Sequence, residues 1–192
     1  MGMTDDYSVE EFTADIPVED YVARYRDADK FGALCRQCPA YGMSWACPPF
    51  DFDTGSVLRR YSGVHLVAVK ITPVHRGIAV DRAQSVLRPE REHLESRLLE
   101  MERRYGGRAF SFVGNCLHCP EGECARRHNQ PCRYPDKVRP SLEAFGFDIG
   151  RTLADLFGIR LLWGHDGLLP EYLVIVGGFF HNGMRSGSDF DL

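Results

Sequence analysis

The sequence contains no apolar run that approaches the roughly 20 residues needed to cross a bilayer. It also lacks an excess of positive charge, because 23 lysines and arginines are outnumbered by 27 aspartates and glutamates. A chain with this balance has no overall positive field to hold a nucleic-acid backbone. Residues 1–10 are acidic, whereas a secretory signal is basic and then apolar. We therefore expect a cytoplasmic protein with neither a membrane segment nor a nucleic-acid partner.

Motifs of several common enzyme classes are missing as well. The glycine pairs Gly106-Gly107 and Gly177-Gly178 do not extend to a G-x-G-x-x-G or G-x4-G-K-S/T phosphate loop. The sequence has neither a G-x-S-x-G nucleophile turn nor an H-E-x-x-H zinc helix. These absences argue against nucleotide-binding, serine hydrolase and zincin functions, and they leave open whether the protein is an enzyme.

The length and composition predict a folded chain with one core. A chain of 192 residues that is 44% hydrophobic can bury a core without disulfide bonds. Residues 1–30 carry nine acids and no sustained apolar period, so we expect an acidic N-terminal segment with only a short helix near residues 18–26. Residues 31–192 are expected to form a single cysteine-rich, metal-binding α/β domain.

The hydrophobic pattern of the larger segment predicts how this α/β domain is built. Residues 61–72 and 108–114 are apolar and rich in β-formers, as in buried strands. Between them, residues 81–105 repeat apolar side chains at helical spacing, which predicts a long crossover helix between parallel strands. Two further strands are predicted at residues 159–163 and 171–176. The expected fold is a mixed four-stranded sheet with a long crossover helix and two cysteine-rich loops.

Cysteine is the most informative residue type in the sequence. Seven cysteines in a reducing compartment are more often metal ligands or redox groups than disulfides. They form two groups, one with the spacing C-x2-C-x8-C and the other with the spacing C-x2-C-x4-C-x7-C. The first group is Cys35, Cys38 and Cys47, and the second is Cys116, Cys119, Cys124 and Cys132.

The spacing and the neighbouring prolines favour iron-sulfur clusters over zinc. Short Cys-x2-Cys runs followed by further cysteines, with prolines beside the ligands, are typical of loops that hold such clusters. One zinc ion could instead be held between the two Cys-x2-Cys pairs, but this would leave Cys47, Cys124 and Cys132 without a role. We therefore expect all seven cysteines to bind one or two clusters of the 4Fe-4S type, with zinc as the alternative.

The number of cysteines also limits how complete two clusters can be. Two four-iron clusters bound by cysteine alone need about eight thiolates, one more than the sequence provides. The three-cysteine site could therefore have an iron open to substrate, or be completed by His118, His128 or Asp51. Alternatively, one cysteine is structural and a smaller cluster is present, or a cysteine of one loop completes the other loop's cluster.

Two longer runs connect the sequence to a known family. The run CRQCPAYGxxWxCPP from residue 35 and the run CRYPxxxRPSxEAxG from residue 132 resemble the predicted metal-binding proteins of domain-of-unknown-function family 2284. The resemblance extends over about residues 30–178. It implies a cytoplasmic metalloprotein with cysteine ligands.

These observations predict a redox function, either electron transfer to a partner protein or substrate binding at an open cluster iron. The alternative is a zinc-stabilised structural or interaction module without redox activity. Five cations of the second loop could stabilise a reduced cluster, dock an acidic electron carrier or simply face solvent. They are Arg126, Arg127, Arg133, Lys137 and Arg139. We expect Arg139 to pair with Glu143, and His118 and His128 to be solvated.

Overall fold

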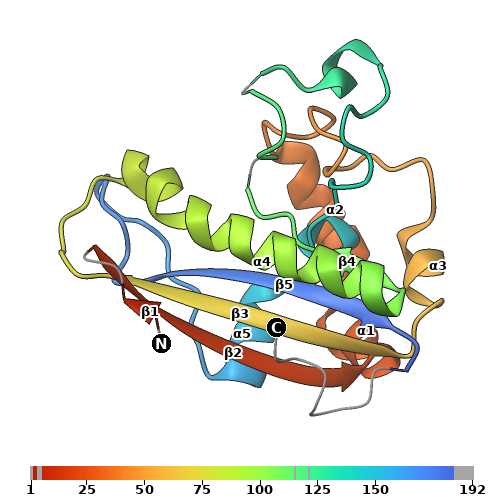
Figure 1. Ribbon diagram of the computed structural model, residues 1–192, viewed down its shortest axis with the longest axis horizontal. Helices are drawn as coiled ribbons and strands as arrows, with labels where there is room; N and C mark the ends of the chain where they lie inside the picture. Colours follow the sequence, from red (N-terminus) through yellow and green to blue (C-terminus); the bar gives the residue numbers. More distant parts are fainter. Residues whose placement is uncertain (1, 4–5, 115, 121, 184–192) are drawn as a thin grey trace.

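An antiparallel sheet forms the centre of the protein. The computed structural model describes residues 2–3, 6–114, 116–120 and 122–183 (Figure 1). The strands lie in the order β1-β2-β3-β5-β4, and each neighbouring pair is antiparallel. They are β1 (Gly2–Met3), β2 (Tyr7–Pro17), β3 (Gly63–Pro73), β4 (Arg108–Phe110) and β5 (Leu173–His181).

Helices cover both faces of this sheet. The long helix α4 crosses one face, and α1 and α5 lie on the other (Figure 1). The α-helices are α1 (Val18–Tyr25), α2 (Ala28–Gln37), α3 (Thr54–Leu58), α4 (Ala83–Tyr105) and α5 (Ile149–Phe157). Three 3-10 helices are η1 (Val80–Arg82), η2 (Ala125–His128) and η3 (Glu143–Phe145). Among the described helices, none combines the length and the apolar character needed to span a membrane.

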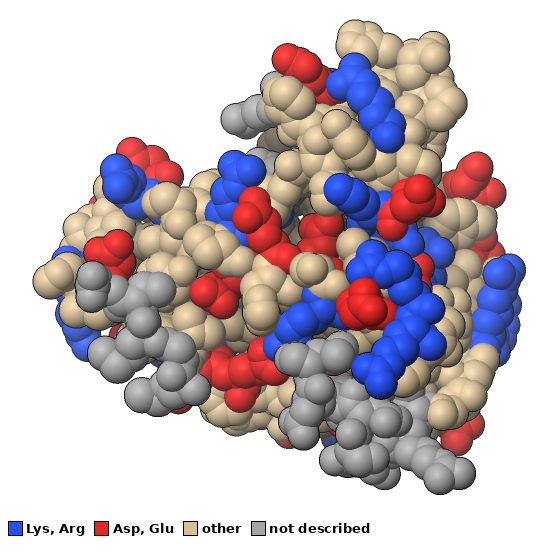
Figure 2. All heavy atoms as spheres, viewed as in Figure 1, with Lys and Arg blue, Asp and Glu red and all other residues tan. Residues whose placement is uncertain are grey.

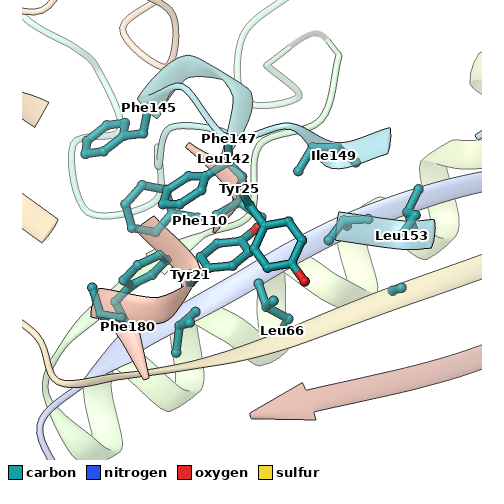
Figure 3. Packing of buried hydrophobic residues seen from close by; sticks show 14 of the residues in the cluster. Tyr21, Tyr25, Leu66, Phe110, Leu142, Phe145, Phe147, Ile149, Leu153 and Phe180 are labelled. Atoms are coloured by element: carbon teal, nitrogen blue, oxygen red, sulfur yellow. The ribbon is translucent and has the colours of Figure 1, made fainter. Parts of the chain in front are cut away.

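The period-2 geometry of β3 divides the core into two clusters. Successive side chains of a strand point to opposite faces, so β3 contributes buried residues to both layers. Its even-numbered positions, Leu66 among them, pack with α1 and α5, and its odd-numbered positions, Val67 among them, pack with α4. The cluster beneath α1 is aromatic: the Tyr21 and Phe147 rings stack at 4.3 Å between centroids (Figure 3). This cluster holds in place the segments from which the two cysteine loops extend.

The junction between α1 and α2 fixes the start of the first cysteine loop. The Asp27 side chain accepts a hydrogen bond from Lys30 N, which is the usual way to satisfy an unpaired amide at a helix N-terminus. Arg26 donates to Phe145 O and to Thr54 Oγ1. These bonds tie α2 to η3 and α3, so the cysteines at the end of α2 have a fixed position.

The fold class predicted from the sequence is confirmed. The structure is α/β with one long helix, and this helix matches the range predicted from periodicity closely and continues through Pro89. The predicted strands at residues 61–72, 108–114 and 171–176 correspond to β3, β4 and β5. The helix near residues 18–26 is present as α1.

The predicted sheet arrangement was wrong in three respects. The neighbouring strands are antiparallel and not mixed, because β5 lies between β3 and β4 and runs opposite to both. Residues 159–163 are not a strand, and the described part of the sheet has five strands where four were expected. The acidic segment contains β2, which pairs with β3 along its whole length. In addition, the expected loop at residues 31–53 begins within α2.

Candidate metal centre

The first cysteine loop begins in the last turn of α2. Cys35 lies on the helix, and Cys38 is its C-cap residue, with Cys38 N bonded to Cys35 O. Gly42 adopts a φ of 70°, a left-handed conformation that glycine accepts without steric cost. Its amide donates to Pro48 O at 2.8 Å, so the loop folds back and Cys47 returns toward Cys38.

The second cysteine loop follows β4, and its residues 116–140 have little regular structure. Its one described helical turn is η2, which follows Cys124. Asn129 ends this turn in the left-handed conformation, which asparagine tolerates better than most residues. Further along, Tyr134 N donates to Cys132 Sγ at 3.4 Å. Local backbone bonds and long-range contacts hold the loop, because its described residues pair with no strand.

The two cysteine loops meet at one cavity. The loops project as a lobe beside α4, and the surface is hollowed where the lobe meets the helix (Figure 2). The cavity has a volume of about 770 Å³ and is lined by residues of both loops and of the first half of α4. Five cysteines line it: Cys38, Cys47, Cys116, Cys119 and Cys124. Thiols separated by almost 70 residues of sequence are thus brought to one site.

The remaining two cysteines have different positions. Cys35 interacts electrostatically with Cys38 and Cys47, so it lies at the edge of the same group. Cys132 lines a separate, open pocket beside Trp45. Five of the thiols, from both loops, thus lie at one cavity, and Cys132 lies apart from them. Which cysteines bind metal stays a prediction.

The charged side chains among the described lining residues of the cavity are arginines, and one of them, Arg88, also pairs with Glu92. Arg88 of α4 and Arg127 of η2 are among its lining residues, and none of the lining residues that the structure describes is an aspartate or glutamate. Arg91 lies one turn along from Arg88 and is only 4% exposed. It interacts electrostatically with Cys116, and it lines a small pocket behind this cysteine. Such surroundings favour an anionic group in the cavity.

Burial keeps several of the thiols protonated. Desolvation raises the pKa of Cys47 to about 11, and neighbouring cysteines add to the rise. The pKa values of Cys35 and Cys116 are also raised by burial, although the amide of His118 opposes this at Cys116 by bonding to its sulfur. A metal binds the thiolate form, so binding at these positions must release protons.

Arg126 joins the two cysteine loops, which the sequence did not indicate. Its guanidinium group donates to the carbonyl oxygens of Ser44, Cys47 and Pro49. The same group lies 4.9 Å from the centre of the Trp45 ring, and Trp45 Nε1 donates to Gln130 O at 3.0 Å. Arg126 is therefore a structural link between the loops and not part of a solvated face.

His118 is paired with a carboxylate, so the expectation of a solvated side chain was wrong. Its Nε2 lies 2.6 Å from Glu95 Oε1 of α4, and the two side chains are only 19% and 17% exposed. Loop position alone made it resemble His128, which is exposed as expected. Asp51, the other candidate for a fourth ligand, is exposed and is not among the residues that line the cavity.

Arg139 has a different partner from the one predicted. It donates to both carboxylate oxygens of Glu102 on α4, not to Glu143. Burial opposes the ionisation of Glu102, but the bonds from Arg139 and from Ala109 N outweigh it and lower the pKa of this carboxyl. Helical spacing suggested the local pair, whereas the fold places α4 nearer to Arg139. Glu143 is instead partly buried and interacts electrostatically with Cys35, and desolvation raises its pKa.

The structure lacks a preformed site for a single metal ion. Within the described ranges, no three side chains of histidine, cysteine, aspartate or glutamate are arranged as ligands of one ion. All seven cysteines are free thiols. The donor atoms and the arginines of the cysteine-lined cavity make it a candidate metal centre.

A cavity lined by several cysteines offers the thiolate ligands that metalloproteins use. Comparison with protein families gives a match to one described as "Predicted metal-binding protein (DUF2284)", over residues 17–176. The chain belongs to this family, as the two cysteine-containing runs indicated. Comparisons with curated proteins and with solved structures found no match.

Sequence reasoning identified the cysteines but missed the residues that α4 contributes to the site. Arg88, Arg91 and Glu95 reach the second loop from a helix 20 to 30 residues earlier in the sequence. One signal was present: Arg91 interrupts the apolar stripe of the helix between Leu87 and Leu94. A charge at a core-facing position usually has a specific partner.

Proposed function

We propose that the protein binds an iron-sulfur cluster in the shared cavity and has a redox function. The observation that carries this proposal is the convergence of five cysteines from both loops on one cavity lined by arginines. Clusters of this kind are held by several thiolates and carry net negative charge, which Arg88 and Arg127 would offset. The seven free thiols fit a reducing compartment such as the cytoplasm.

The size of the ligand set favours a cluster over zinc. A structural zinc ion takes four ligands within about 2.3 Å of one point and has no use for more. The cavity offers five thiols, with Cys35 beside them. A polynuclear centre can use ligands spread over a larger volume. The thiols beyond the four that one cluster needs can bind a second cluster or exchange with its ligands.

The protein's own residues define what such a centre would do. The cysteines would hold the cluster, which supplies one-electron transfer or, at an iron without a thiolate, a site for substrate. Arg88, Arg91 and Arg127 would stabilise negative charge and thereby favour the reduced state. Electron transfer to a partner protein is the form of this function that we favour. A structural zinc module is the competing possibility.

Reconstitution without oxygen tests this proposal. We expect purified apoprotein incubated with iron and sulfide to bind about four irons and four sulfides for each cluster, or about eight of each if two clusters form. The measurements are iron, sulfide and zinc analysis together with the EPR spectrum of the reduced protein. Stoichiometric zinc without acid-labile sulfide, in protein purified anaerobically, would contradict the proposal.

Two serine variants distinguish one shared centre from two. Cys47→Ser removes a thiol that lines the cavity, and we expect it to lose most of the bound iron. Cys132→Ser removes the thiol in the separate pocket beside Trp45. If a single centre occupies the cavity, Cys132→Ser keeps its iron, whereas a second cluster held by Cys132 would lose about half of the total.

A further inference from the structure

The surroundings of His118 differ from those of an ordinary loop histidine. It lies between Cys116 and Cys119 in the sequence, and it lines the cavity together with both. It also lines the small pocket behind Cys116, so it forms part of the wall between the two spaces. His118 therefore lies beside the thiols of the proposed metal centre.

Glu95 approaches His118 from α4 on the side away from the cavity. The carboxylate lies against Nε2, and it lines the small pocket but not the cavity. Both groups are mostly buried, so their position costs desolvation that a purely solvent-facing pair would not incur. A carboxylate at one ring nitrogen is the arrangement that usually orients a metal-binding histidine and increases its basicity.

We propose that His118 is a nitrogen ligand of the metal centre and that Glu95 is its positioning residue. This inference rests on the proposed iron-sulfur centre. The neutral ring would donate the lone pair of Nδ1 to iron, while its proton stays on Nε2 beside Glu95. Any proton on Nδ1 leaves to solvent when the bond forms, so no oxidant or reductant is needed. A neutral histidine in place of a thiolate makes a cluster less negative and raises its reduction potential.

The other candidates for a non-cysteine ligand fit less well. His128 is exposed on the same loop and is not among the residues that line the cavity. Asp51 is exposed as well. His128 is therefore the matched control for His118, because it is the same residue type in the same loop without the carboxylate partner found for His118.

The test is pulsed EPR of the full chain carrying histidine labelled with ¹⁵N only in the ring. Ring labelling matters because the backbone amide of His118 bonds to Cys116 Sγ and would otherwise give its own coupling. In the reduced, reconstituted protein we expect a strong ¹⁵N coupling. The coupling should disappear in His118→Ala and persist in His128→Ala. Glu95→Gln should weaken it and change the reduction potential, whereas Glu100→Gln, at an exposed position of α4 where the carboxylate pairs with Arg103, should do neither.

The outcomes distinguish a failure of the histidine-ligand proposal from a failure of the iron-sulfur proposal on which it rests. A wild-type cluster without ¹⁵N coupling overturns the histidine ligand and leaves the iron-sulfur proposal intact. Failure of the wild type to form any cluster overturns the iron-sulfur proposal itself. The wild-type spectrum decides the matter even if His118→Ala does not fold. A coupling that persists in a folded His118→Ala protein would assign the ligand to another histidine and also overturn the inference.

Discussion

Arg126 gives the two cysteine loops a common anchor through three backbone carbonyls and one indole ring. Replacing it with alanine removes the guanidinium bonds to these carbonyls, of which Ser44 O keeps its bond from Cys47 N, and it removes a cation–π contact. Hydrogen bonds to charged groups and such contacts together suggest a loss of about 2 kcal/mol in the free energy of unfolding. We expect Arg126→Ala to lose this stability and to bind less iron, as measured by urea unfolding and metal analysis.

The neighbouring residue, Arg127, provides the control for the Arg126→Ala variant. Arg127 is exposed and lines the cavity but has no corresponding contact with the first loop in the described structure. Arg127→Ala should keep the stability of the wild type within about 0.5 kcal/mol, as surface substitutions usually do. Equal losses in the two variants would show that charge, and not the link between the loops, is what matters.

At the scale of elements, the close approach of α4 to β5 depends on a glycine. A Cβ at Gly177 would lie 2.6 Å from Leu98 Cδ1 and 3.1 Å from Phe110 O. Leu98 is fully buried, so it has little room to move. We expect Gly177→Ala to lower the free energy of unfolding by about 1–3 kcal/mol, the usual cost of overpacking a core. Thermal and urea unfolding would measure it.

A glycine within a helix serves as the contrast. At Gly32 in α2, the nearest atom to an added Cβ is Arg36 Nη1 at 3.6 Å, an ordinary contact. Gly32→Ala should therefore stabilise the protein by up to about 1 kcal/mol, because alanine has the higher helix propensity. Destabilisation by Gly32→Ala, or no effect of Gly177→Ala, would contradict this account of the packing.

The elements also explain which parts of the fold could be predicted. Helix α4 was found because its apolar stripe repeats over more than 20 residues. Strand β2 was missed because Glu11 and Asp15 face α4 and pair with Arg97 and His65, so acids occupy positions that would otherwise be apolar. Residues 159–163 looked like a strand because Ile159 and Leu161 pack on the helical layer.

The same reasoning applies to the candidate site. Cysteine spacing along the chain identified the thiols, because ligands of one loop are close in sequence. The pairs Arg126 with Trp45 and Glu95 with His118 join segments that are distant in sequence. No local sequence pattern predicts such contacts, because they depend on how the loops pack against each other and against α4.

At the scale of the whole molecule, two kinds of desolvated group limit the pH range over which the metal-free protein is most stable. Burial lowers the pKa of His65 below its ordinary 6.5, so the unfolded chain takes up the proton first as pH falls. Burial raises the pKa of Cys47 from 9.0 to about 11, so the unfolded chain loses the proton first as pH rises. Stability should therefore fall below pH 6.5 and again above pH 9.

Urea unfolding of reduced, metal-free protein between pH 5 and pH 10 would test both limits. His65→Gln should flatten the acidic limb, whatever its effect on stability at neutral pH. His93→Gln, at an exposed position of α4, should leave the slope unchanged. A wild-type stability that does not change across pH 5–7 would contradict the role given to His65.

The placement of β5 between β3 and β4 constrains when the centre can be assembled in a cell. Both cysteine loops leave the ribosome before β5 does, yet β4, which carries the second loop, has its only described sheet partner in β5. At roughly 5–20 residues per second, several seconds separate the last cysteine from the end of this strand. During that interval seven thiols are exposed on a nascent chain whose sheet is incomplete. For the metal centre proposed above, metal delivery would therefore follow synthesis of β5, and a metal bound earlier would meet an incomplete site.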